Sequence, residues 1–235
     1  MLDKTSIVCY NIFKNSERLG LSMDNRGRFI ALEGIDGSGK STQVNMLASR
    51  LRELGAPCYA TKEPTDSPIG SLIRQILTGR LKADKRILAN LFAADRADHL
   101  LNETDGICDK IKAGVNVITD RYYFSSYAYH GVDMDMDWVI SLNALSYNIL
   151  RPDITVFLDI PVERAMQRIK DRRRHEELFE SEARLRLTRD KYFEAFDKLG
   201  GEERVSIIGA DAGEVEVAER IWGEMCKLFR LTKPV

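Results

Sequence analysis

A glycine-rich segment near the start of the chain carries the residue types that bind a nucleotide phosphate. It reads Gly34-Ile35-Asp36-Gly37-Ser38-Gly39-Lys40-Ser41, and Thr42 follows. This order fits the phosphate-binding loop, in which glycines let successive N–H groups turn toward phosphate oxygens. Lys40 would supply a cation for the β- and γ-phosphates, and the Ser41 hydroxyl would ligate Mg²⁺. A chance match in a glycine-rich turn is the alternative, but a strand pattern before the segment and an amphipathic helix pattern after it favour a nucleoside triphosphate site.

A second candidate site follows the apolar run 115–119. Asp120 comes directly after this run, and in phosphate-loop proteins such a carboxylate lies beside the loop and binds Mg²⁺. The next residue, Arg121, would emerge at the carboxyl end of the sheet, where ligands bind in open α/β folds. Its guanidinium could hold a phosphate with two hydrogen bonds. An ordinary ion pair at a strand end is the alternative.

A basic run could meet the charge that develops during phosphoryl transfer. The phosphate-binding loop has no arginine of its own, so cations at the moving phosphoryl group must come from elsewhere in the chain. The best supplier is the run that contains Arg168, Lys170, Arg172, Arg173 and Arg174. A solvated helix face is the usual interpretation of such a run. A nucleic-acid patch is a weaker one, because no aromatic residues interleave with the basic ones.

Phe92 and Arg96 lie four residues apart, so a helix would place both on one face. A ring for stacking beside a bidentate donor could hold a nucleobase. Taken alone, however, the pair is better explained as a core phenylalanine and a surface arginine.

The elements that must position these residues alternate between short apolar runs and helical patterns. Most runs are continuously apolar, as is typical of strands buried on both faces of a parallel sheet. The alternation predicts an α/β fold with a doubly wound, five-stranded parallel sheet flanked by helices. The expected strands are 29–32, 58–61, 115–119, 154–159 and 205–208, and the expected helices lie within 44–54, 69–77, 84–112, 138–149, 162–169 and 217–228.

Composition excludes several classes of protein. Hydrophobic residues make up 44% of the 235 and charged residues 30%, which excludes disordered and low-complexity chains. The formal net charge of −1 argues against a globally basic nucleic-acid binder. The cysteines lack metal-like spacing, and no apolar run approaches the roughly 18 residues that span a bilayer. We therefore expect a cytoplasmic protein without structural zinc or a membrane partner.

Together the motifs resemble the thymidylate kinase family over about residues 28–230. The phosphate-binding loop alone would suit many NTPases, whereas the combination is far more restrictive. Lys62 departs from the family pattern, which has arginine there. The most specific segments are 29–36, Thr61-Lys62-Glu63-Pro64, Leu91-Phe92-Ala93-Ala94-Asp95-Arg96, and Asp120-Arg121-Tyr122 followed by 125–129.

The resemblance implies a division of the chain and a set of partners. Residues 1–27 would be an extension, and residues 28–235 a single P-loop kinase domain. A lid at about residues 171–180 would close over ATP, with residues near 210–212 beside the adenine. The protein would be a homodimer whose partners are the small molecules ATP and dTMP, with Mg²⁺ and no nucleic acid.

The resemblance also assigns roles to residues. Phe92 would stack on thymine, Arg96 would hydrogen-bond the base, and Arg121 would hold the dTMP phosphate. Asp36 would lie near the acceptor phosphate and is a further candidate Mg²⁺ ligand beside Ser41 and Asp120. The remaining substrate-binding residues would be Arg74, Glu63, Ser125, Ser126 at the base edge, and Tyr129 under the sugar. The catalytic group would comprise Lys40, Asp36, Arg121, Arg168, Arg172, Arg173 and Arg174.

The reaction that we expect is ATP + dTMP → ADP + dTDP, a step of dTTP biosynthesis. One alternative is a kinase for another nucleoside monophosphate or a deoxynucleoside. A non-enzymatic nucleotide switch is less favoured, because the chain contains no guanine-reading Asn-Lys-x-Asp motif.

Overall fold

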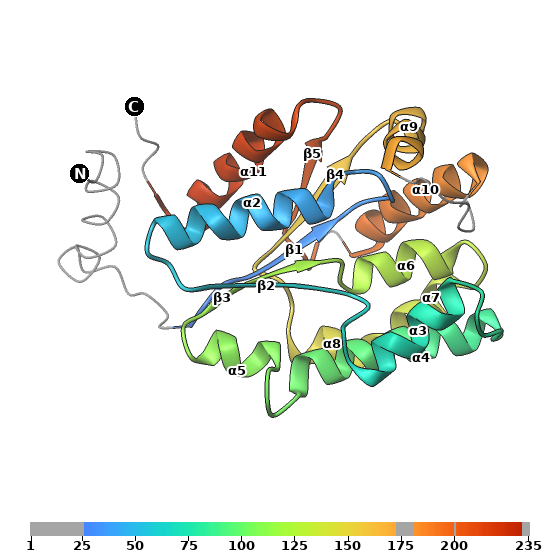
Figure 1. Ribbon diagram of the computed structural model, residues 1–235. Helices are drawn as coiled ribbons and strands as arrows, with labels where there is room; N and C mark the ends of the chain where they lie inside the picture. Colours follow the sequence, from blue (N-terminus) through green and yellow to red (C-terminus); the bar gives the residue numbers. More distant parts are fainter. Residues whose placement is uncertain (1–25, 173–180, 200, 232–235) are drawn as a thin grey trace.

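The computed structural model describes residues 26–172, 181–199 and 201–231. Its centre is a five-stranded parallel sheet in the order β2-β3-β1-β4-β5 (Figure 1). The strands are β1 (Phe29–Glu33), β2 (Cys58–Lys62), β3 (Asn116–Asp120), β4 (Ile154–Asp159) and β5 (Val205–Gly209). The inner strands are almost wholly buried, which explains their continuously apolar sequences. The predicted α/β fold is therefore confirmed.

Helices cover both faces of this sheet (Figure 1). On one face lie α2 (Lys40–Glu53) and α11 (Glu214–Leu228), which contact each other. On the other face lie α4 (Lys85–Leu101), α5 (Ile107–Lys112), α6 (Tyr123–Gly131) and α8 (Ala144–Ile149). Next to these pack α3 (Pro68–Leu77), α7 (Met136–Leu142), α10 (Glu182–Leu199) and α9 (Val162–Arg172). No helix in the described ranges is long and apolar enough to cross a membrane.

The helical stretch expected over 84–112 is wrong in its middle, because the chain breaks between α4 and α5. Asn102 leaves the helical region with ψ 127°, and its side-chain oxygen accepts a hydrogen bond from the N–H of Thr104 at 3.0 Å. Such local bonds compete with helix continuation. At Gly106 a Cβ atom would lie 2.4 Å from the carbonyl oxygen of Asn102, so the tight turn requires glycine.

Two further differences concern helices near the site. The stretch 138–149 is divided at Asn143 into α7 and α8, since its side chain turns inward and donates to the carbonyl oxygen of Val139 at 2.8 Å. Helix α6 was not expected from periodicity. It is buried on nearly every side, so it has no polar face to create an amphipathic pattern.

The strand register brings the candidate segments to one edge of the sheet. Leu32 of β1 and Lys62 of β2 both pair with Asp120 of β3, so the carboxyl ends of these three strands lie level. The phosphate-binding loop follows β1, and Arg121 follows β3. This edge is where an open α/β sheet binds its ligands.

Candidate functional site

The loop between β1 and α2 is shaped for a bound anion. Gly37 has a φ of 80°, and a Cβ atom there would lie 2.4 Å from the carbonyl oxygen of Ala165, so only glycine fits. The Ser38 hydroxyl is buried and has no hydrogen-bond partner among the described residues. The loop then enters the N-terminus of α2, whose free N–H groups and dipole favour negative charge.

Lys40, the first residue of α2, places its ammonium group inside this loop. Its Nζ donates to the carbonyl oxygens of Gly34 at 3.0 Å and Ile35 at 2.9 Å. The side chain is buried, and burial is the main reason that the pKa of Lys40 is lowered to about 8, with the nearby Arg121 charge adding to it. A phosphate would give this desolvated cation a charged partner in place of two carbonyl groups.

Ser41 and Asp120 form a pair of oxygen ligands at the mouth of the loop. The Ser41 hydroxyl donates to Oδ2 of Asp120 at 2.5 Å. The second carboxylate oxygen, Oδ1, is buried and has no hydrogen-bond partner among the residues that the structure describes. A hydroxyl beside an unsatisfied carboxylate oxygen fits Mg²⁺, which prefers hard oxygen ligands. Asp36, the third candidate ligand, faces Arg121, with which it forms an ion pair.

Arg121 is held in an unusual backbone conformation between the loop and α6. Its φ is 75°, a left-handed value that residues other than glycine rarely adopt. Besides pairing with Asp36, its guanidinium donates to Oγ of Ser125 at 3.1 Å and to the Tyr129 hydroxyl at 3.2 Å. The guanidinium also lies 4.8 Å from the Tyr129 ring centroid. The structure thus brings Asp36, Arg121, Ser125 and Tyr129 together.

A cavity of about 280 Å³ adjoins this cluster. Arg121 and Asp36 lie in the same lining as Phe92 and Arg96 of α4, so the cavity has charged groups and a ring available to one ligand. Its complete lining is Asp36, Glu63, Pro64, Leu77, Leu88, Phe92, Arg96, Arg121, Ser125, Ser126, Tyr129, His130 and Arg184.

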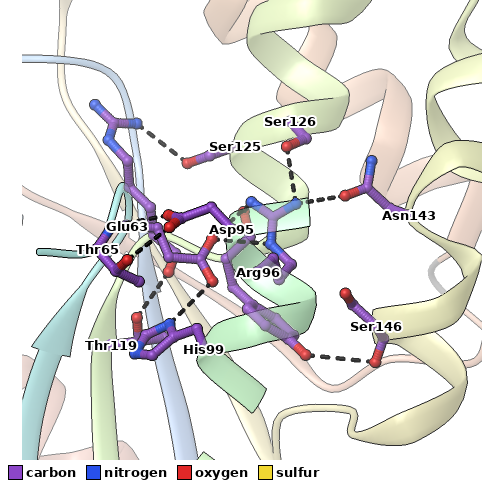
Figure 2. A network of polar contacts seen from close by, with 12 residues as sticks. Glu63, Thr65, Asp95, Arg96, His99, Thr119, Ser125, Ser126, Asn143 and Ser146 are labelled. Carbon is purple, nitrogen blue, oxygen red and sulfur yellow. Dashed lines mark hydrogen bonds and ion pairs between the residues drawn. The ribbon is translucent and has the colours of Figure 1, made fainter. Parts of the chain in front are cut away.

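Arg96 is not a surface residue, since its side chain is only 1% exposed. Figure 2 shows it between Glu63 on one side and Ser126 and Asn143 on the other. Its Nε donates to Oε2 of Glu63 at 2.8 Å, and Nη1 donates to Oγ of Ser126 at 3.0 Å and to Oδ1 of Asn143. Burial alone would lower the pKa of Arg96, but the Glu63 carboxylate outweighs it and the pKa is raised. This cation is therefore fixed in position before any ligand arrives.

Arg74 does not line the cavity. From α3 its guanidinium donates to the carbonyl oxygen of Thr65 and, at 3.4 Å, to that of Pro64. It also lies 3.5 Å from the Asp66 carboxylate. These contacts hold the segment that follows β2, which itself contributes Glu63 and Pro64 to the cavity.

The basic run is described only in part. Arg168 of α9 donates to the carbonyl oxygen of Ser38 at 3.4 Å and to those of Ala210 and Ala212 at 3.0 and 3.2 Å. It therefore bridges the phosphate-binding loop and the turn after β5, and it is not on a solvated face. Arg172 ends α9, and Arg173, Arg174 and the remainder of the expected lid to residue 180 lie outside the described residues.

Comparison with known proteins identifies the family of this chain. The thymidylate kinase family model matches residues 32–221, from β1 into α11. The chain belongs to the thymidylate kinase family. It is 40% identical over 183 residues to a probable thymidylate kinase of Thermococcus kodakarensis, covering 73% of this chain and 86% of the relative. A probable thymidylate kinase of Pyrococcus abyssi is 38% identical over 205 residues, 83% of this chain and 94% of the relative.

The cavity also contains residues outside the motifs that resemble the family. His130 and Arg184 are the polar ones, and Leu77 and Leu88 are the apolar ones. His130 lies one turn after Ser126 on α6, a spacing that could have indicated a shared face. Its ring centroid is 5.3 Å from that of Phe92, and burial, aided by the charges of Arg96 and Arg184, lowers its pKa to about 4. The imidazole is therefore neutral at physiological pH.

Proposed function

We propose that this thymidylate kinase transfers the γ-phosphoryl group of ATP to dTMP with Mg²⁺, and so acts in dTTP biosynthesis. The observation that carries the proposal is the continuity of two sites. The phosphate-binding loop and the cavity share Asp36, which lies in the loop and lines the cavity. A donor phosphate and an acceptor phosphate bound at these sites would meet at Arg121.

On the donor side, we assign the triphosphate to residues 34–42. Lys40 would turn from the loop carbonyls to the phosphate oxygens, a short movement for a flexible side chain. Ser41 and Asp120 would hold the metal ion, and Asp36 would stay with Arg121. Mg²⁺ supplies neutralisation of phosphate charge when it is bound. Arg168 would hold the phosphate-binding loop against the turn after β5, which we expect beside the adenine, through its hydrogen bonds to carbonyl oxygens of both segments.

On the acceptor side, we assign thymine to the end of the cavity that contains Phe92 and Arg96. Phe92 would stack on the base. Each nitrogen of Arg96 already has an acceptor in the protein, with Nη2 facing Glu63 and the carbonyl oxygen of Tyr122. A base oxygen would therefore share Nη1 with the Ser126 hydroxyl, which also lines the cavity. Tyr129 would pack against the sugar, and Arg121 would hold the phosphate.

The transfer itself needs positioning and charge neutralisation more than proton abstraction. The dTMP phosphate is already an anionic nucleophile, so no general base is required. Holding donor and acceptor in line would supply much of the rate through proximity. The arginines of the 168–174 run are the proposed source of positive charge at the moving phosphoryl group.

Phosphorus NMR tests this proposal directly. With ATP, Mg²⁺ and dTMP, the wild-type protein should form dTDP and ADP in equal amounts. Without dTMP, ADP should not accumulate. Hydrolysis of a nucleoside triphosphate at the same rate without an acceptor would favour the nucleotide switch and contradict the kinase.

We also propose that the enzyme is a homodimer that associates through α3, α4 and α8. Helix α4 contacts both α3 and α8, and the three helices lie at the same side of the molecule in Figure 1. They expose large apolar side chains, and soluble monomers rarely leave an apolar patch of this kind in contact with water. The exposed residues are Leu72, Leu77, Ile87, Leu101 and Leu145.

The remaining assignments are of place and organisation. We propose a cytoplasmic enzyme, since Cys58 and Cys108 are free thiols, as a reducing compartment allows. Its partners would be small nucleotides and not nucleic acid, in keeping with the net charge of −1. Residues 1–27 would be an extension to one domain, 28–235.

A further inference from the structure

Glu33 is a fully buried carboxylate directly before the phosphate-binding loop. It ends β1 and is 0% exposed, although a charged group is rarely placed in a core without partners. Oε1 accepts hydrogen bonds from the backbone N–H of Tyr122 at 2.8 Å and of Ser125 at 3.2 Å. Oε2 accepts from the hydroxyls of Ser125 at 2.5 Å and Tyr192 at 2.9 Å. Both oxygens are thus committed to the start of α6 and to α10.

The first pair of these bonds fixes the backbone around Arg121. The left-handed conformation at this residue persists only if its surroundings over-determine it. Its own N–H donates to the carbonyl oxygen of Leu32 at 2.9 Å, and its carbonyl oxygen accepts from the Thr119 hydroxyl at 2.8 Å. Glu33 takes the next N–H in the chain, that of Tyr122, and so closes the turn.

The second pair connects Glu33 to the guanidinium itself. The Ser125 hydroxyl donates to Glu33 and accepts from Nη1 of Arg121 at 3.1 Å. The order Glu33–Ser125–Arg121 needs an acceptor at residue 33, which receives the Ser125 proton and leaves the hydroxyl lone pair for the arginine. Because donors face both oxygens of Glu33, a carboxylate satisfies them all and an amide does not. Burial raises the pKa of Glu33, while the Ser125 hydrogen bond and the Arg121 charge act in the opposite direction.

We propose that Glu33 is a positioning residue for the acceptor phosphate, acting through both the backbone and the guanidinium of Arg121. This rests on the proposed role of Arg121 in holding that phosphate. Glu33 does not line the cavity, so we expect it to act through Arg121 and not by direct contact with a ligand. A change at Glu33 should therefore weaken the binding only of ligands that carry a phosphate. A residue that merely supports the fold would affect the binding of dTMP and thymidine alike.

Calorimetry with dTMP and with thymidine tests the proposal in the full-length protein. Glu33→Gln replaces one acceptor oxygen by an NH₂ group that faces the same donors. We expect dTMP affinity to fall by roughly tenfold or more, the usual cost of losing hydrogen bonds to a charged group, and thymidine affinity to stay within about twofold. In steady-state kinetics, KM for dTMP should rise while KM for ATP changes little.

Asp153→Asn is the matched control. Asp153 is a buried carboxylate at the opposite end of β1, where Oδ2 accepts from the N–H of Phe29 at 2.8 Å. It makes the same carboxylate-to-amide change directly before β4, beside the first residue of β1 and at the other end of that strand from Arg121. We expect it to lower the melting temperature and to leave the ratio of dTMP to thymidine affinity unchanged.

The measurements distinguish failure of the role of Glu33 from failure of the role of Arg121. Equal loss of affinity for both ligands in Glu33→Gln, or no loss for either, would overturn the positioning role. If wild-type protein binds dTMP no more tightly than thymidine, the assignment of Arg121 to the phosphate fails first, and this inference fails with it. If Glu33→Gln does not fold, Ser125→Ala decides, because it cuts the link to the guanidinium and keeps the carboxylate. A selective loss of dTMP affinity there supports the proposal, and unchanged binding of both ligands contradicts it.

Discussion

The buried ammonium group of Lys40 should make ATP use depend on pH. Its pKa is lowered to about 8, mainly by burial and further by Arg121, while the carboxylates of Asp120, Asp36 and Glu33 oppose this. As the pH rises through 8, the free enzyme therefore loses the charge that would bind the phosphates. We expect kcat/KM for ATP, which reports the free enzyme, to fall by up to about tenfold per pH unit above pH 8.

Lys40→Arg provides the control for this profile, because a guanidinium stays protonated over the whole range. Its residual activity, though lower, should show no alkaline fall. A wild-type profile that stays level to pH 9.5 would contradict the assignment of Lys40 to the triphosphate.

Phe92 offers a test of the base site. The side chain is half-buried in the cavity wall beside His130, so its truncation should remove stacking and leave the donor side intact. We expect Phe92→Ala to weaken dTMP binding by about 1–3 kcal/mol, the range for base–aromatic stacking. Calorimetry should find ATP binding little changed. Unchanged dTMP affinity with a lower melting temperature would instead make Phe92 a core residue.

At this scale, the sequence predicted residues whose function is encoded locally. The loop from Gly34 to Ser41 could be recognised because its chemistry depends on consecutive backbone groups. The burial of Arg96 could not, because Glu63, Ser126 and Asn143 come from separate segments that only the fold brings around it. The spacing of His130 after Ser126 indicates a shared face of α6, but its place beside Phe92 depends on the packing of α6 against α4.

Among the elements, α9 and the segment that follows it carry the proposed transition-state charge. Arg168, Arg172, Arg173 and Arg174 should each be changed singly to alanine. At least one variant should lose about 10²-fold in kcat, the size of a lost preorganised donor, with dTMP affinity nearly constant. Lysine at the same position should restore activity only partly, because an ammonium cannot span two phosphoryl oxygens.

The measurement is steady-state kinetics of the four alanine variants beside dTMP calorimetry. Arg168→Ala has its own expected signature, since its carbonyl contacts join the loop to the turn after β5. It should raise KM for ATP as well as lower kcat. Normal kcat in all four variants would leave the run without a role in transfer.

Helices that bury only one face, and strands that are short and continuously apolar, could be predicted from the sequence. All the expected strands formed, with ends within one residue of those observed. Helix α6 was missed because it is surrounded by protein and shows no helical stripe. The break at Asn102 depends on a side-chain hydrogen bond that periodicity does not register.

For the whole molecule, the exposed apolar face of α3, α4 and α8 predicts association. Ile87 is 54% exposed and Leu145 58% exposed, and burying both against a second copy would favour a dimer. Sedimentation should give twice the monomer mass for wild type, and Ile87→Lys with Leu145→Lys should shift it to the monomer.

Val215→Lys is the control, because Val215 is 69% exposed on α11, across the sheet from that face. It should leave the dimer intact. A monomeric wild type, or equal dissociation by the control, would contradict this face as the interface.

The architecture as a whole followed from the alternation of strands and helices, because parallel strands require crossover connections. What the sequence could not supply is the shape of the space between them. The size of the cavity and its contact with Arg184 of α10 depend on how helices distant in sequence pack.

Selectivity among acceptors tests the central claim most directly. A coupled ADP-release assay should compare dTMP, dUMP, ribothymidine monophosphate, dCMP and the purine monophosphates at fixed ATP and Mg²⁺. We expect dTMP to have the highest kcat/KM, with dUMP lower by about tenfold or more because it lacks one methyl group. Ribothymidine monophosphate should also be a poor substrate, because Tyr129 packs under the sugar, where a 2′-hydroxyl would clash. A purine monophosphate or a deoxynucleoside as the best substrate would contradict the account.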